Sequence, residues 1–214
     1  MSSFFFKGIP QNRLAGFCAV RDALDNLSNT LHLAELVNTC AGYRVKDYDE
    51  QFDFAIFTGD YYRALIRKKD GFFSMALPFQ IIDNGETISF NLDSFGEEIN
   101  GRFISIIRNA ILTAKNGIMS HEEIVLSISD SFGLDVSDAT HYYDAFAALL
   151  AEDHGYLRFD DDFKNANGDV HPRYHFDFFY KNTSAVKIGI DGLADIDCFY
   201  NLFDSGRPKH YLGR

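Results

Sequence analysis

The amino-acid sequence predicts an α+β protein with N-terminal helices, an antiparallel β-meander and a C-terminal half that adds helices and strands. Three observations support this prediction. Apolar residues recur at helical spacing in residues 11–41 and 99–152. Residues 52–91 instead consist of short aromatic and β-branched runs between glycine-containing turns. The hydrophobic fraction of 46% provides a sizeable core for a chain of 214 residues.

The N-terminal segment 11–41 predicts helix, with a break at residues 26–29 and a stop at Gly42. Asparagine and serine favour helix caps over helix interiors, because their side chains compete for the backbone hydrogen bonds. Glycine is common just after the last helical residue.

The meander is predicted from four short runs of strand-forming residues, separated by turn signals. The runs are Phe52–Thr58, Tyr61–Lys68, Phe72–Phe79 and Thr87–Asn91, and the turns contain Gly59-Asp60, Asp70-Gly71 and Asn84-Gly85. Asn84-Gly85 predicts a two-residue hairpin. A helical turn is the alternative for residues 61–68, because Tyr62, Leu65 and Ile66 also fit helical spacing.

Two capping boxes and several stop signals divide the C-terminal half. Ser94 with Glu97 and Ser120 with Glu123 each predict a helix start. Asn116-Gly117 and Gly133 predict the ends of these helices, and a third helix follows from about residue 137 to residue 154. The remaining elements are predicted as strands Tyr156–Phe159, His171–Tyr180 and Val186–Ile190, a polar loop at 160–169 and a last helix, Leu193–Phe203.

The order of three helices, strand, polar loop and strand over residues 99–180 resembles a winged helix-turn-helix domain. The residues that carry the resemblance are Ser120-x-x-Glu123 and Leu150…Gly155-Tyr156-Leu157. The chain therefore divides into a helical and meander region at 1–92 and a winged-helix-like region at 93–214. Their connection is short and apolar on both sides, so we expect the two regions to pack together.

Charge disfavours nucleic acid as the partner. The chain has 31 acidic and 20 basic residues, a net charge of −11, and an acidic surface repels phosphate. The resemblance places the third helix in the DNA-reading position, yet its polar residues include Asp138 and Asp144 and no lysine or arginine. We expect poor duplex DNA binding, and a non-enzymatic protein that binds another protein through its acidic surface. That partner surface could be a basic nucleic-acid groove.

The candidate catalytic residues lie on one strand face. Alternation along His171–Phe178 places His171, Arg173, His175 and Asp177 on one side and apolar residues on the other. Histidine can transfer protons, arginine can hold an anion, and aspartate can orient an imidazole.

The alternative function is therefore a metal-independent hydrolase or nuclease, which Arg207 and His210 could join. The simpler interpretation is an exposed face with surface ion pairs worth ~0–1 kcal/mol each. We expect no metal, because His171, His175 and Asp177 would span roughly 20 Å along one strand. No cofactor motif occurs, and we expect no cofactor.

Cysteine usage and the N-terminus predict the compartment. Cys18, Cys40 and Cys198 are far apart and odd in number, which indicates neither a disulfide framework nor a zinc site. The first seven residues are too short for a signal peptide, and no run of 18 apolar residues is present. We expect a cytoplasmic protein of bacterial or phage origin that does not enter a membrane.

Overall fold

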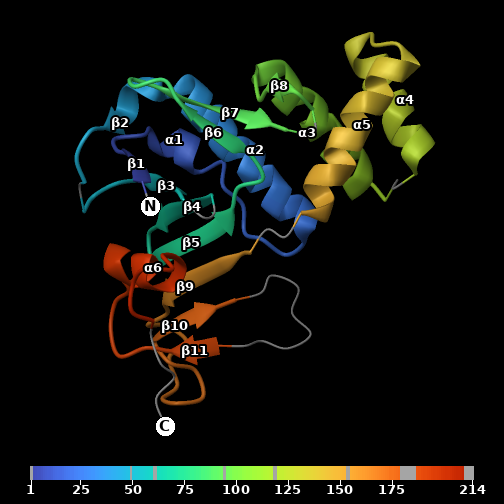
Figure 1. The fold of residues 1–214 in the computed structure, drawn as a ribbon. Coiled ribbons are helices and arrows are strands. Elements are labelled where there is room, and N and C mark those ends of the chain that lie inside the picture. The colour runs from blue at the N-terminus through green and yellow to red at the C-terminus, as the bar shows by residue number, and fades with distance from the viewer. Residues whose placement is uncertain are drawn as a thin grey trace.

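The computed structural model describes residues 2–48, 50–59, 62–93, 95–117, 120–152, 155–178 and 187–209. It is an α+β fold built on a mainly antiparallel sheet (Figure 1). The main sheet has the strand order β11-β10-β9-β5-β4-β3-β1-β2, and a smaller sheet has the order β6-β7-β8. The strands of the main sheet are β1 (Ser2–Phe6), β2 (Arg44–Val45), β3 (Phe54–Thr58), β4 (Arg63–Lys68), β5 (Gly71–Ala76), β9 (Leu157–Asp161), β10 (Tyr174–Asp177) and β11 (Lys187–Gly189). Those of the smaller sheet are β6 (Gln80–Asp83), β7 (Ile88–Leu92) and β8 (Glu97–Glu98).

Helices pack on both faces of the main sheet. They are α1 (Gln11–Leu14), α2 (Ala23–Thr39), α3 (Gly101–Lys115), α4 (His121–Phe132), α5 (Val136–Ala151) and α6 (Ile196–Phe203), with a 3₁₀ turn, η1 (Ala41–Tyr43). None of the helices in the described part of the chain has both the length and the apolar character needed to cross a membrane.

The two faces of the main sheet have separate cores. The α2 face carries Phe54, Ile66 and Met75, which share one buried cluster with residues of α2 and α3. The α6 face carries Leu157, Phe159, Phe176 and neighbours, which pack with Phe199 of α6. Strands β9 and β10 contribute apolar side chains to the α6 face alone, so their other face is left for polar residues.

The predicted break at residues 26–29 is wrong. Asp22 caps α2 and accepts from the backbone N–H of Asp25, so the helix starts before the asparagines and runs through them. Asn29 is buried, and its amide bonds the backbone N–H and C=O of Cys18. The interruption therefore lies between α1 and α2, and Asn29 stabilises that connecting segment instead of ending a helix.

The meander forms, and residues 63–68 are strand rather than helix. Its members divide between two sheets, because β3, β4 and β5 lie in the main sheet while β6 and β7 lie in the smaller one. The predicted Asn84-Gly85 turn is displaced by one residue. The backbone N–H of Asn84 donates to the C=O of Thr87 (2.9 Å), which leaves Gly85 and Glu86 at the tip. Gly85 has φ +85°, as the first central position of a type II′ turn requires.

The first capping box does not start a helix. Glu97 lies in β8, and α3 begins at Gly101, where the Asn100 side chain accepts from the N–H of Phe103 (3.0 Å); Ser94 lies outside the described residues. Three other boundaries are confirmed: Asn116 ends α3, α4 begins at His121, and Gly133 (φ 63°) ends α4 before α5. The Ser120 side chain makes no capping hydrogen bond at the start of α4, and α5 ends at Ala151 rather than at residue 154.

The strands after the helices extend the sheet of the N-terminal half. β9 pairs with β5 on one side and with β10 on the other. The approach at β5 is close, because a Cβ on Gly71 (φ +144°) would lie 2.0 Å from the C=O oxygen of Phe159. The regions 1–92 and 93–214 therefore share one continuous sheet.

Candidate functional site

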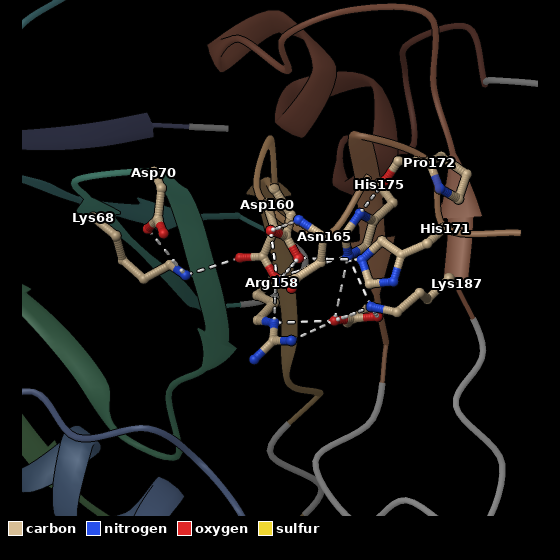
Figure 2. Close-up of polar contacts among 11 residues, drawn as sticks. Lys68, Asp70, Arg158, Asp160, Asn165, His171, Pro172, His175 and Lys187 are labelled. Atoms are coloured by element: carbon tan, nitrogen blue, oxygen red, sulfur yellow. Dashed lines mark hydrogen bonds and ion pairs between the residues drawn. The ribbon is translucent and has the colours of Figure 1, made fainter. Parts of the chain in front are cut away.

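The candidate catalytic strand belongs to a cluster of charged residues on the α2 face of the outer strands (Figure 2). We call it the sheet-face cluster and define it as Lys68, Arg158, Asp160, His175, Asp177 and Lys187. Strand pairing builds it. His175 lies opposite Asp160, and Asp177 lies opposite both Arg158 and Lys187. Because side chains alternate along each strand, these residues share the face that the helices leave uncovered.

His175 is the buried centre of the cluster, with 1% of its surface exposed. Its Nδ1 lies 2.8 Å from the C=O oxygen of Pro172, and its Nε2 lies 2.8 Å from Nζ of Lys187. A lysine ammonium can only donate, so Nε2 accepts and Nδ1–H donates to Pro172. The ring of His171 packs edge-on against it, with the ring centroids 5.0 Å apart. The expectation of an exposed face is therefore wrong for His175, which acts as a buried hydrogen-bonding residue.

The two carboxylates of the cluster are both shared between cations. Asp177 accepts from Nζ of Lys187 (2.9 and 3.1 Å) and from Nη2 (2.5 Å) and Nε (3.1 Å) of Arg158. Burial raises the pKa of Asp177, but the hydrogen bonds from Lys187 and Arg158 outweigh it and lower the pKa overall. Asp160 contacts Nε of Arg158 (2.7 Å) and Nζ of Lys68 (2.9 Å). Three cations thus face two carboxylates.

The structure brings together three of the four candidate catalytic residues. His171, His175 and Asp177 lie at the cluster, where Nε2 of His171 is 3.1 Å from Asp162. Arg173 is separate: it forms a bidentate pair with Asp161 (2.6 and 3.0 Å) and lies over the rings of Phe163 and Tyr174. The alternation fails there because β10 begins only at Tyr174. The predicted apolar side is present, since Tyr174, Phe176 and Phe178 pack on the α6 face.

Four cluster residues were not identified from the sequence: Lys68, Arg158, Asp160 and Lys187. The sequence contained a signal for two of them. Arg158 and Asp160 alternate with Leu157, Phe159 and Asp161, a pattern that places Arg158 and Asp160 together on the face opposite Leu157 and Phe159. Their partners depend on strand order, which pairs β9 with β10 across the polar loop and with β5 from the other half of the chain.

The C-terminal candidates lie elsewhere. Arg207 pairs with Asp197 (3.0 Å), and its guanidinium lies over the ring of Tyr200. Both contacts are with α6. His210 lies outside the described residues.

Three residues of the cluster have the spacing of metal ligands. The ligand atoms of Asp160, His175 and Asp177 all lie within 4.8 Å of one another. Asp160 supplies the third group that one strand alone could not. However, Lys187 already bonds both His175 and Asp177, and Arg158 contacts both carboxylates. A divalent ion would be repelled by these cations, so the residues fit an ion-pair network better than a metal centre.

Asp138 and Asp144 lie on a second surface, formed by the αα-hairpin of α4 and α5. We call residues 120–152 the acidic hairpin. Figure 1 shows α4 and α5 at the end of the molecule opposite β10 and β11. Its acidic residues are all exposed: Glu122, Glu123, Asp130, Asp135, Asp138, Asp144 and Glu152. The hairpin has no lysine or arginine, and none of its acids forms a salt bridge with any described residue.

An apolar groove runs along the same hairpin. It has a volume of about 270 Å³ and is lined by Ile124, Tyr143, Phe146, Ala147, Leu150 and Ala151. Leu126 and Val136 are also exposed on these helices. The acidic hairpin therefore combines unpaired negative charge with accessible apolar surface.

Comparisons with protein-family models, with curated proteins and with solved structures find no match to this chain.

Proposed function

We propose that this protein is a non-enzymatic interaction protein that binds a basic surface of another protein through the acidic hairpin. The observation that carries the proposal is the run of exposed, unpaired acids on α4 and α5 with no lysine or arginine among them. Unpaired charge of one sign creates a potential that attracts an oppositely charged partner and accelerates association.

The apolar groove supports the same proposal. Charge complementarity contributes mainly to specificity and association rate, whereas buried apolar contacts supply much of the affinity. A partner with an apolar side chain flanked by lysine or arginine would match the groove beside Tyr143 and Phe146 and the acids around it.

The winged-helix resemblance enters the proposal as a scaffold. Three helices, α3 to α5, precede the paired strands β9 and β10, and α5 would take the DNA-reading position. Asp138 and Asp144 on α5 would repel a phosphate backbone. We therefore expect no specific duplex DNA binding near ~10⁻⁸ M, the affinity typical of a dedicated DNA-binding protein. In one version of the proposal the partner surface itself binds nucleic acid.

The compartment is part of the proposal as well. Cys18, Cys40 and Cys198 are free thiols, as in proteins of reducing compartments. We place the interaction in the cytoplasm of a bacterial cell.

A charge-matched comparison tests the proposal. Four hairpin acids are neutralised in Glu122→Gln/Asp130→Asn/Asp138→Asn/Asp144→Asn. The control, Asp47→Asn/Glu86→Gln/Glu98→Gln/Asp191→Asn, removes four exposed, unpaired acids elsewhere. Both variants and the wild type are immobilised and exposed to host lysate at increasing salt.

We expect a basic protein to be retained by the wild type and the control but not by the hairpin variant. Its binding should weaken with salt, because screening shortens the range of the attraction. Release by added duplex DNA would identify the partner surface as a nucleic-acid groove. Retention of the same proteins by all three chains would disprove the proposal.

A metal-independent hydrolase or nuclease is the second candidate, supported by the convergence of His171, His175 and Asp177. Two features oppose it: His175 is 1% exposed, and both of its ring nitrogens are engaged. A phosphodiester assay with the wild type and His175→Gln decides this point. Activity that His175→Gln abolishes, with an unchanged melting temperature, would favour the hydrolase.

A further inference from the structure

A cavity of about 600 Å³ lies on the α2 face beside the sheet-face cluster. The main sheet extends beyond its helical cover. At that boundary, α1 and the segment after it form one wall, while β4, β5 and β9 form the floor. The apolar lining comprises Leu14, Phe17, Ile66, Phe73 and Tyr156. The volume is within the range of pockets that hold small organic ligands, roughly 300–1,000 Å³.

The lining is basic although the protein is acidic. Arg67, Lys68, Lys69 and Arg158 line the cavity, with Asp53 as its one acid among the described residues. Arg67 turns its guanidinium to the α6 face, over Phe52 and Phe72. Lys68 and Arg158 are paired with Asp160 and Asp177 of the sheet-face cluster, so Lys69 is the unpaired positive charge of the lining. Asp53 already accepts from the backbone N–H of Ile9 (2.9 Å).

A second cavity, of about 560 Å³ on the α6 face, lacks this excess. It shares Arg67, Lys68 and Lys69 but is also lined by Glu50, Asp195 and Asp197. The positive excess is thus specific to the cavity on the α2 face, and size alone does not produce it.

Two of the cationic groups retain free hydrogen-bond donors. Lys69 is exposed and forms no hydrogen bond or ion pair with any described residue. Arg158 uses Nε and Nη2 on Asp160 and Asp177, while its Nη1 has no hydrogen-bond partner among the described residues. Figure 2 shows one terminal nitrogen of Arg158 directed away from the carboxylates. The carboxylates hold this guanidinium in place, so an incoming anion would meet an oriented donor.

Aromatic rings lie next to these donors. Phe73 contacts Phe17, with the ring centroids 5.6 Å apart, and Tyr156, at 6.2 Å. Burial raises the pKa of Tyr156 from its usual value of 10 to about 12, so the ring presents a neutral phenol well beyond neutral pH.

We propose that this cavity binds a phosphomonoester carried on a flat ring, of the nucleoside monophosphate kind. The phosphate would accept from Lys69 and Nη1 of Arg158, and the ring would pack on Phe17, Phe73 and Tyr156. Arginine and lysine donors recognise phosphate oxygens through charge-assisted hydrogen bonds. This inference is independent of partner binding by the acidic hairpin, so either can fail alone.

Titration calorimetry on the full chain tests the proposal with adenosine 5′-monophosphate. Adenosine, inorganic phosphate and benzoate separate the contributions of ring, phosphate and carboxylate. Lys69→Gln removes an unpaired cation from the lining, and Lys164→Gln is its matched control, an exposed, unpaired lysine outside the cavity. Ala19→Trp fills the cavity from an exposed lining position and leaves every cation in place.

We expect the monophosphate to bind more tightly than adenosine, phosphate or benzoate. Lys69→Gln should weaken binding about tenfold or more, the loss of one charge-assisted bond. Lys164→Gln should have no effect, and Ala19→Trp should abolish binding with an unchanged melting temperature.

Alkylation of Cys18 locates the ligand, because this exposed thiol lines the cavity. Bound monophosphate should slow its modification. Absence of binding by the wild type, equal affinity of Lys69→Gln and Lys164→Gln, or tighter binding of benzoate would each overturn the proposal.

Discussion

The sheet-face cluster and the acidic hairpin are both rich in charge, but they use it in opposite ways. In the cluster, Asp160 and Asp177 each contact two cations, and the central His175 is buried. On the hairpin, the acids are exposed and have no cationic partner among the described residues. Charge in the first region is neutralised within the fold, whereas charge in the second remains available to another molecule.

The difference shows how composition alone can mislead. The net charge of −11 describes neither region, because the cluster has more cations than carboxylates and the hairpin has no cation. Titratable residues that occur close together in sequence are therefore a weak guide to a site until their partners are known. Single substitutions in each region can show whether the two regions differ as much in energy as they do in geometry.

The largest effect is expected for Gly71→Ala, at the junction between the cluster strands and the rest of the sheet. Its φ of +144° and the 2.0 Å approach of the Phe159 oxygen leave no space for a Cβ. We expect a loss of about 3 kcal/mol in the free energy of unfolding, measured by urea denaturation. Gly42→Ala, which meets nothing within 4 Å, should change it by less than about 1 kcal/mol.

Amide hydrogen exchange would show which strands and helices lose stability in Gly71→Ala. If β9–β11 lose protection in Gly71→Ala while α4 and α5 keep theirs, the two regions are separable units of stability. An unchanged free energy of unfolding would contradict the close β5–β9 approach.

The second-largest loss of stability is expected for Asp177→Asn, which removes a carboxylate that both Arg158 and Lys187 contact. Removing one partner of a partly buried ion pair leaves charges without compensation, and we expect a loss of about 2–3 kcal/mol at pH 7. Asp144→Asn on the hairpin removes the same charge from an exposed, unpaired site and should change stability by less than about 0.5 kcal/mol.

The pH dependence of Asp177→Asn has a defined sign. The folded pKa of Asp177 is lowered, so the stability it adds is present above its unfolded pKa of 3.8 and is lost as the pH falls through the lower folded value. The difference between wild type and Asp177→Asn should therefore shrink on acidification below about pH 4. A difference that is constant from pH 7 to pH 3 would mean that the carboxylate charge is not what stabilises the cluster.

Much of the fold could be predicted because local signals set it. Gly133 ends α4 and Asn116 ends α3, as their short-range chemistry indicates. The errors arose where tertiary contacts override local preference. Asn29 is inside a helix because its amide bonds Cys18, and α3 starts at the cap Asn100 rather than at Ser94.

The candidate site could be predicted only in part, for a related reason. Alternation placed His175 and Asp177 on the polar face, and they do meet. It could not show that Arg158 from β9 and Lys187 from β11 neutralise Asp177, since strand order decides which residues become neighbours. Nor could it show that His175 is buried.

The smallest effect is expected for Arg173→Gln, which tests the boundary of the cluster. Arg173 was predicted to act together with His175, yet it pairs with Asp161 on the open surface. Exposed pairs are screened by salt, and the Debye length falls to about 3 Å at 1 M. Any destabilisation by Arg173→Gln should therefore be slight and should disappear at 1 M salt, as measured by thermal melting.

The destabilisation by Asp177→Asn should persist under the same conditions, because its partners are partly buried. If Arg173→Gln instead destabilised the protein as much as Asp177→Asn at both salt concentrations, Arg173 would belong to the cluster. The region whose charge is neutralised within the fold would then include all four residues of the predicted face.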